Sequence, residues 1–491
     1  MYIKKSNINT PMVMKVMGWL LVIEALFMAV PMTVSLCYKE YDSARAFLYA
    51  ILITLGLGVT MTKFIRPARM EMHRKEGFLL TSFIWVIFSL FGMMPFLFSG
   101  VVDNLTNAFF ETMAGFTTTG STVFIDVEML PKGILLWRSL MQWIGGMGII
   151  LFTLAVMPMF NQTGGVQLFN AEVTGITHDK LRPRVSQTAL GLWGVYIGLT
   201  VMMFVLLCFG PMNIFDSICH TLSCVSTGGF STKNNSIGFW DSRYVDSIVV
   251  LFMFVGGINF SLLYNLLQGK VKSILKNEVL KWYVLLCVIG TFICFADLYF
   301  RGENTNIIDC AIDSLFHITA TISTTGYSVE TYKWGQFSLM MLIILMISCA
   351  CAGSTSGGLK IDRMIVMFKN VKNEFRKAIH PNLVTTVRMN GKVVPYAHVQ
   401  RTIAFLVIFT LILIVSTLII TLFNIDVFDS FFMSLSALCN VGYGAEIGDG
   451  GALINLPDTV KWILSFDMLI GRLELFTVLI LFTKGFWVKI N

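Results

Sequence analysis

Charged residues are scarce in this chain of 491 amino acids: Asp, Glu, Lys and Arg make up 13% of it, against about 25% in ordinary soluble domains. Apolar runs of about 20 residues, which is long enough to cross a bilayer, occur many times instead. The 10 cysteines form no Cys-x-x-Cys pair, so neither a zinc site nor a disulfide framework is indicated. The composition therefore excludes a soluble domain and indicates a polytopic membrane protein.

Recognisable catalytic motifs are also missing from the sequence. It contains no His-Glu-x-x-His, no Gly-x-Ser-x-Gly, no Walker loop and no dinucleotide fingerprint. A membrane-embedded enzyme is therefore the least favoured class of function, and we expect no nucleotide site in this chain. No small-residue cleavage pattern follows the first apolar run, so we expect the first span to be retained.

One short, glycine-centred and mostly hydroxyl-rich segment occurs four times: Thr118-Thr119-Gly120, Thr227-Gly228-Gly229, Thr324-Thr325-Gly326 and Asn440-Val441-Gly442. An Asn or Asp stands thirteen residues before each final glycine, namely Asn107, Asp216, Asp313 and Asp429. Asn and Asp are favoured helix N-caps, so the spacing predicts a short helix capped at these residues and followed by the glycine segment. Four copies at one spacing argue against the alternative, which is a set of unrelated turns.

The physical use of such a segment follows from the needs of a dehydrated cation. Backbone carbonyls from several segments can replace its water, as in the Thr-Val-Gly-Tyr-Gly loops of potassium channels. Glycine permits the backbone angles that point successive carbonyls the same way. The fourth copy contains the string Val441-Gly442-Tyr443-Gly444. We therefore predict that the four copies meet and bind K⁺ through backbone oxygens.

The glycine segments divide the chain into repeats. Residues 1–76 hold two spans without a glycine segment, and four units of span, short helix, glycine segment and span follow: 77–184, 185–272, 273–392 and 393–491. The predicted fold class is an all-α polytopic membrane protein with four tandem span–pore helix–span repeats around a central pore, preceded by two extra transmembrane helices. About ten spans result. For Glu24, inside the first span, we expect a hydrogen bond between helices, with a functional carboxylate as the alternative.

A second regularity lies in the second span of each unit. In every unit a glycine follows the last glycine of the glycine segment by 25 to 29 residues, namely Gly145, Gly256, Gly353 and Gly471. The residues directly after these glycines are Gly146, Gly257, Ser354 and Arg472. Close helix packing explains the first two pairs. The stretch 350–359 instead favours an unwound intramembrane loop, because Gly353, Ser354, Thr355, Gly357 and Gly358 lie in it, just before Lys360. We expect Arg472 on the pore axis beside this loop, with a structural ion pair as the alternative.

The distribution of Lys and Arg predicts the orientation. The segments between units are basic, most strongly 360–392, where Lys and Arg far exceed Asp and Glu. By the positive-inside rule these segments and both termini face the cytoplasm. The glycine segments then open outward.

Several motifs resemble one known family. Trp137-Arg138-Ser139 with 142–148 resembles the first repeat of TrkH/KtrB potassium-uptake proteins, and 228–232, 352–360 and 471–474 are similar to later signatures. The resemblance covers essentially the whole chain, and the two extra spans point to the TrkH branch. The fourth glycine segment departs from the pattern, because it lacks the Thr-Thr-Gly of the first and third.

The resemblance implies a homodimer that takes up potassium across the bacterial inner membrane. K⁺ would be the transported ligand and would bind at the filter only. The intramembrane loop and Arg472 would form a gate, controlled by a TrkA-like cytosolic nucleotide-binding ring. The residues leave open whether the protein is a channel or a carrier coupled to Na⁺ or H⁺.

Overall fold

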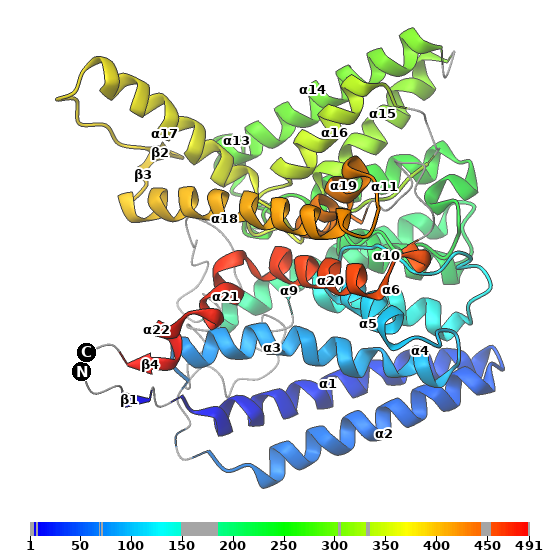
Figure 1. Cartoon of the computed structure of the whole chain (residues 1–491). Helices are drawn as coiled ribbons and strands as arrows, with labels where there is room; N and C mark the ends of the chain where they lie inside the picture. The colour runs from blue at the N-terminus through cyan, green and yellow to red at the C-terminus, as the bar shows by residue number, and fades with distance from the viewer. Residues whose placement is uncertain are drawn as a thin grey trace.

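The computed structural model is a bundle of helices of unequal length (Figure 1). It describes residues 4–5, 8–67, 69, 72–148, 185–302, 306–329, 334–442 and 453–489. Strands occupy only eight of these residues, as the antiparallel pairs β1 (Lys4–Lys5) with β4 (Val488–Lys489) and β2 (Arg388–Met389) with β3 (Lys392–Val393). The first pair brings the two ends of the chain together. The predicted all-α class is confirmed.

The two extra helices lie side by side along one edge of the bundle (Figure 1). They are α1 (Thr10–Cys37) and α2 (Tyr41–Phe64). A Cβ placed on Gly18 would lie 2.9 Å from the carbonyl oxygen of Gly58, and one on Gly58 would lie 2.9 Å from that of Gly18. Small residues at such a contact let two membrane helices approach closely.

Glu24 in α1 differs from the expectation. Its side chain is fully buried, and neither carboxylate oxygen has a hydrogen-bond partner among the described residues. The predicted hydrogen bond between helices is therefore wrong. The carboxyl group instead faces the backbone of Gly92, where an added Cβ would lie 3.4 Å from Glu24 Oε1.

Within the described residues, six stretches of helix are long and apolar enough to cross a membrane. They are α1, α2, α3 (Arg74–Gly92) continued by α4 (Met94–Phe98), α9 (Val185–Cys208), α14 (Glu278–Arg301) and α18 (Tyr396–Thr421). They match the two extra spans and the first span of each unit. The chain is thus a multi-pass membrane protein. The second span predicted for the first unit lies partly outside the described residues.

Four short helices each precede one of the glycine segments: α5 (Leu105–Phe116), α10 (Ile214–Val225), α15 (Ile307–Ile322) and α19 (Val427–Cys439). We call them the pore helices. Their C-terminal ends agree with the prediction of a short helix followed by a glycine segment, because each helix ends one or two residues before that segment. Their N-caps do not, because the capping side chains belong to Asn104, Asn213, Asn306 and Asp426.

The predicted caps are therefore wrong, although the spacing behind them is regular. Asn107, Asp216 and Asp429 lie in the first turn, three residues after the true caps. Asp313 lies deeper, because α15 begins about one turn earlier than the other three. A carboxylate in the first turn also suits the positive end of a helix. Asp216 accepts a hydrogen bond from the Asn213 side chain at 2.9 Å, so the acid follows the cap without being it.

The second helices of the units are short or broken. The first unit has α6 (Lys132–Gly146), and the second has α11 (Arg243–Gly256) and α12 (Phe260–Leu267), which meet at 103°. The third has α16 (Gln336–Ser348) and α17 (Ile361–Ile379), and the fourth has α20 (Asp458–Leu473) and α21 (Leu475–Leu479). A break was predicted only in the third unit. The prediction of continuous second spans in the second and fourth units is therefore wrong.

The remaining short helices connect these parts or end the chain: η2 (Ser236–Trp240), α13 (Val271–Leu275), η4 (Leu453–Asn455), η5 (Ile480–Phe482) and α22 (Lys484–Trp487). One large apolar core joins the two extra helices and all four units, and Phe316 and Met346 are among its residues from the third unit. A second, smaller core packs α14 to α17 of the third unit. The third unit therefore has a core that is partly its own.

Candidate functional site

The four pore helices lead into one repeated backbone conformation. Thr118, Thr227, Thr324 and Asn440 have φ angles of 55°, 54°, 62° and 54°. Two residues later, Gly120, Gly229, Gly326 and Gly442 have φ angles of 88°, 82°, 75° and 81°. Non-glycine residues rarely adopt positive φ, and such residues persist only where the surrounding structure holds them. The four segments 118–120, 227–229, 324–326 and 440–442 are therefore copies of one built feature, which we call the filter segments.

Each filter glycine faces a carbonyl oxygen of the next unit. A Cβ added to Gly120 would lie 2.1 Å from the Gly228 oxygen, and one added to Gly229 would lie 1.9 Å from the Thr325 oxygen. A Cβ added to Gly326 would lie 2.1 Å from the Val441 oxygen, and one added to Gly442 would lie 2.0 Å from the Thr119 oxygen. The contacts run from the first unit through the fourth and back to the first. The four filter segments thus close into a ring, as the sequence predicts. Such a ring can supply oxygens to a dehydrated cation.

The fourth filter segment differs in sequence but not in backbone. Asn tolerates the left-handed conformation better than most residues. The Asn440 side-chain nitrogen donates to Thr119 Oγ1 and to the Met468 carbonyl, both at 2.9 Å. This side chain ties the fourth filter segment to the first. Tyr443 and Gly444 lie outside the described residues.

The predicted intramembrane loop lies directly against the filter segments. Thr355 Oγ1 accepts a hydrogen bond from Thr227 Oγ1 at 3.1 Å, and the Gly357 N–H donates to Thr324 Oγ1 at 3.4 Å. A Cβ on Gly357 would lie 2.6 Å from Asn440 Oδ1. The loop therefore contacts three of the four filter segments.

The bend of the second unit supplies the loop with hydrogen-bond partners. Asn259 Nδ2 donates to the Ala352 carbonyl at 2.6 Å, and the Phe260 N–H donates to the Gly353 carbonyl at 2.9 Å. In return, the Cys351 N–H donates to the Gly257 carbonyl at 3.1 Å. Non-helical backbone at membrane depth is tolerated only where it is buried in protein or lines a wet cavity. The bend of the second unit and the loop of the third unit thus supply each other with hydrogen-bond partners.

Within the loop, small residues meet specific backbone needs. Gly353 and Gly358 have φ angles of 76° and 70°, and a Cβ on Gly358 would lie 2.0 Å from the Cys349 sulfur. Ser354 Oγ donates to the Cys351 carbonyl at 2.6 Å. The loop therefore has a defined conformation that larger residues would disrupt.

Arg472 crosses from the fourth unit to the third and the first. Its Nη1 donates to the Thr355 carbonyl of the loop at 2.5 Å. Its Nη2 donates to the carbonyls of Gly145 and of Gly146, the latter at 2.8 Å. These carbonyls end α6, where the helix dipole places negative partial charge. The side chain thus lies beside the loop, at the level that the sequence comparison of the four units predicts.

The end of the loop is tied to the break in the fourth unit. Lys360 is buried with a φ angle of 69° and immediately precedes α17. Arg363, in the first turn of α17, forms an ion pair with Glu474, the residue with φ 64° that separates α20 from α21. The Arg363 guanidinium also lies 4.1 Å from the ring centroid of Phe405. α17 is therefore connected both to the loop, which it follows directly, and to the C-terminal end of α20.

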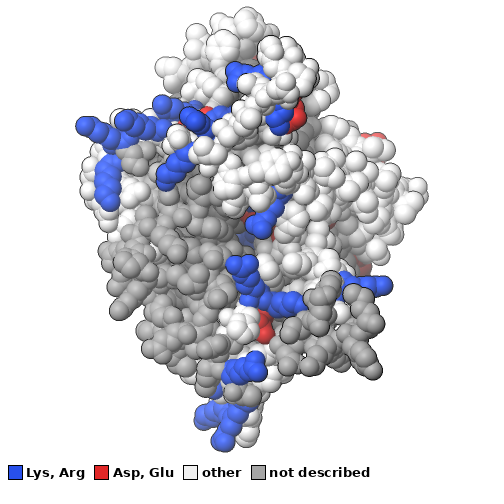
Figure 2. Space-filling model, turned by 90° about the vertical axis from the view of Figure 1, so that its left-hand side faces the viewer, with Lys and Arg blue, Asp and Glu red and all other residues white. Residues whose placement is uncertain are grey.

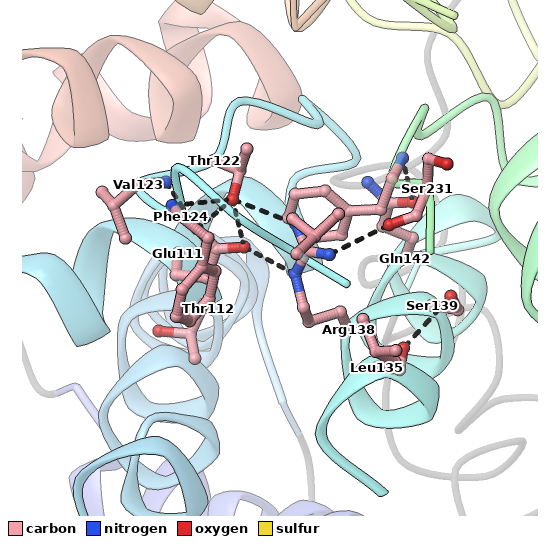
Figure 3. Close-up of polar contacts among 12 residues, drawn as sticks. Glu111, Thr112, Thr122, Val123, Phe124, Leu135, Arg138, Ser139, Gln142 and Ser231 are labelled. Atoms are coloured by element: carbon pink, nitrogen blue, oxygen red, sulfur yellow. Dashed lines mark hydrogen bonds and ion pairs between the residues drawn. The ribbon is translucent and has the colours of Figure 1, made fainter. Parts of the chain in front are cut away.

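Three further residues support the filter segments, and sequence reasoning assigned them no role. Glu111 and Arg138 form a buried ion pair with 2.8 Å between Oε1 and Nε (Figure 3). Gln142 Nε2 donates to the Gly228 carbonyl at 2.7 Å, and its Oε1 accepts from the Phe230 N–H at 3.1 Å. A buried acid in a pore helix, with an Arg in the next helix, was the available signal.

The outer loops of the first two units are joined by Asn234. Its side-chain nitrogen donates to Asp126 at 2.8 Å, and its oxygen accepts from the Val127 N–H at 2.8 Å. This hydrogen bond holds the pKa of the exposed Asp126 carboxyl below its ordinary value. The side chain of Asn234 therefore joins the loop that follows the first filter segment to the loop that follows the second.

Fold and site together define a membrane transport protein with four pore repeats around one ring of backbone oxygens. Across the described part of the chain, no group of three or more His, Cys, Asp or Glu could hold a metal ion. The candidate ligands for a cation are the carbonyl oxygens that the four filter segments bring into the ring. The chain belongs to the TrkH family of cation transport proteins, whose profile matches residues 42–488.

Named relatives are similar over nearly the full length. The Trk system potassium uptake protein TrkH of Salmonella typhimurium is 34% identical over 482 residues, covering 96% of this chain and 98% of that protein. The protein of the same name from Escherichia coli K12 is 33% identical over 478 residues, with 96% and 98% covered. The crystal structure of the potassium transporter TrkH from Vibrio parahaemolyticus superposes with a TM-score of 0.88 at 29% identity, covering 98% of this chain and 100% of that one.

The ring geometry predicts that Gly229 tolerates no side chain. Gly229→Ala adds a Cβ 1.9 Å from the Thr325 oxygen at a φ angle of 82°. Backbone strain alone should cost about 1–3 kcal/mol of stability, so the apparent Tm of the purified protein should fall. Gly194→Ala is the matched control, because a Cβ there meets nothing within 4 Å. Equal Tm values for the two variants would contradict the ring.

Proposed function

We propose that this chain takes up potassium ions across the bacterial inner membrane, through a filter formed by the four filter segments. The single observation that carries the proposal is the closed ring of carbonyl oxygens from Thr119, Gly228, Thr325 and Val441. K⁺ sheds its water when carbonyl oxygens replace the hydration shell. The names of the relatives, potassium uptake protein and potassium transporter, agree with this choice of ion.

Selectivity in this proposal depends on a uniform ring. Gly120→Ser places a side chain 2.1 Å from the Gly228 oxygen and should distort that edge of the ring. Preference for K⁺ over Na⁺ should therefore fall, which ion fluxes into proteoliposomes measure. Gly56→Ser, where a Cβ meets nothing within 4 Å, is the control. A Gly120→Ser protein that is active with unchanged Na⁺ exclusion would count against this filter.

The gate is proposed to consist of the intramembrane loop and Arg472. The loop contacts the filter segments, and Arg472 holds its Thr355 carbonyl while also binding the end of α6. A fixed positive charge at this level repels K⁺ in transit, and the hydrogen bonds hold the loop in place. Opening would require α17 to move, since Arg363 links that helix to Glu474.

Loss of Arg472 should open this gate. Arg472→Ala removes the charge and the hydrogen bonds to the carbonyls of Thr355, Gly145 and Gly146, so K⁺ flux through the isolated protein should rise without any partner. Arg45→Ala is a control in an exposed ion pair with Asp42. Wild-type flux in a folded Arg472→Ala protein would make Arg472 structural and move the gate elsewhere.

The proposed orientation in the membrane and the proposed docking surface for a partner rest on the distribution of Lys and Arg. On the face that carries both chain ends, the described Lys and Arg residues outnumber Asp and Glu (Figure 2), and positive residues favour the cytoplasmic side. We infer that both termini are cytoplasmic. We also infer that the protein forms a homodimer. Each chain would consist of an extension, 1–76, and four pore units, 77–184, 185–272, 273–392 and 393–491. A TrkA-like nucleotide-binding ring would dock on 360–392, where α17 extends from the bundle (Figure 1).

Charge reversal on α17 tests this docking surface. Lys372 and Arg376 are exposed, whereas Lys369 pairs with Glu278 and the Arg388 carbonyl. Reversing all three should weaken binding of a TrkA-like ring in a pull-down, and the loss should be largest at low salt, because salt screens exposed charges. Reversing the exposed Lys270 and Lys272 is the matched control. Undiminished binding by the α17 variant would place the docking surface elsewhere.

A further inference from the structure

The buried ion pair Glu111–Arg138 supplies none of the carbonyl oxygens of the proposed filter and is not part of the proposed gate. Side-chain exposure is 0% for Glu111 and 2% for Arg138. Burying two charges is costly, and a hydrophobic pair of similar volume is often at least as stable. Stability alone is therefore a weak explanation for the presence of this pair. The residues that the pair contacts are more informative.

Glu111 holds the continuation of the first filter segment to its own pore helix. Both of its carboxylate oxygens accept from Thr122 Oγ1, at 3.1 and 3.0 Å, and Oε2 also accepts from the Val123 N–H at 2.9 Å. Thr122 lies two residues beyond the filter glycine. The carboxylate thus fixes where the chain leaves the ring (Figure 3).

Arg138 joins this anchor to the second filter segment. Its Nη2 donates to Thr122 Oγ1 at 3.0 Å, and its Nη1 donates to the Ser231 carbonyl at 3.2 Å. Its guanidinium lies 4.1 Å from the ring centroid of Phe230, which follows Gly229 directly. One rigid, planar group therefore spans the first and second units just beyond the ring (Figure 3).

The same helix adds a second contact one turn later. Gln142 follows Arg138 by four residues on α6, and residues at this spacing share a helix face. Its side chain binds the Gly228 carbonyl and the Phe230 N–H. One face of α6 thus holds the second filter segment at two levels.

The other units carry no ion pair at the positions equivalent to Glu111 and Arg138, although Arg243 of the second unit pairs with Asp313 of the third at other positions. Nine residues before the filter glycine, where the first unit has Glu111, the other units have His220, His317 and Met433. Seven residues before the glycine of the second helix, where the first unit has Arg138, they have Val249, Met346 and Leu464. The edge between the first and second filter segments is therefore the one edge of the ring where these equivalent positions carry an ion pair.

We propose that Glu111 and Arg138 are positioning residues that determine ion specificity, because together they fix the spacing between the first and second filter segments. The inference rests on the proposed function and deepens it. A ring held at one spacing on this edge fits K⁺, whereas a ring free to contract there would also coordinate the smaller Na⁺.

Two mild variants of the full-length protein test this proposal in proteoliposomes. Arg138→Lys keeps the charge but loses the planar fork that reaches Glu111, Thr122 and Ser231. Thr122→Val removes the bridging hydroxyl and leaves both charges in place. The ratio of K⁺ to Na⁺ uptake rates should fall at least about tenfold in each, the change expected for one lost hydrogen bond to a charged group. K⁺ uptake itself should persist.

Arg243→Lys is the matched control, because Arg243 pairs with acids of α11 and α15. An unchanged ratio in active Arg138→Lys or Thr122→Val would overturn the proposal, and so would an equal fall in the control. If Arg138→Lys does not fold, Thr122→Val decides alone. A wild-type protein without K⁺ preference would instead refute the proposed function, so the two failures are distinguishable.

Discussion

The contact between each filter glycine and a carbonyl oxygen of the next unit is the constraint on which the rest of the structure depends. At 1.9–2.1 Å from an added Cβ, none of the four positions has room for a side chain. The backbone must also hold positive φ at two residues in each segment. Such strain persists only where the surroundings impose it. Pore helices, buried side chains and loops must therefore be placed so that four strained segments meet.

The broken second helices can be understood as part of the same arrangement. Unwound backbone needs partners at membrane depth, and the loop of the third unit finds them at the bend of the second unit and at Arg472 of the fourth. The Arg363–Glu474 pair then ties the loop's far end to the break in the fourth unit. The elements that contact the filter segments are thus coupled to α17, the helix that extends from the bundle (Figure 1).

Much of this could be predicted from the sequence because the fold repeats. Four glycines at equivalent positions predicted four filter segments, each preceded by a short helix. The caps were misplaced because an acid in the first turn of a helix gives the same regular spacing as a cap. The bend after Gly256 and the break at Glu474 were missed, because their partners lie in other units and no local signal marks them.

The supporting residues were equally hidden. Glu111 stands in an apolar run, and only the folded chain places Arg138, Thr122 and Ser231 around it. Glu24 shows the opposite case, since a buried acid in a span suggested a hydrogen bond that the structure does not contain. Long-range pairing of polar groups is thus the part of the site that sequence patterns convey least.

The most direct test of the central claim is to locate the bound ion. Crystals of the protein grown with Rb⁺ or Tl⁺ in place of K⁺ would give an anomalous signal at any occupied site. The ring account predicts a peak among the carbonyl oxygens of Thr119, Gly228, Thr325 and Val441. An absence of any peak there, with the ion bound elsewhere in the protein, would contradict the account.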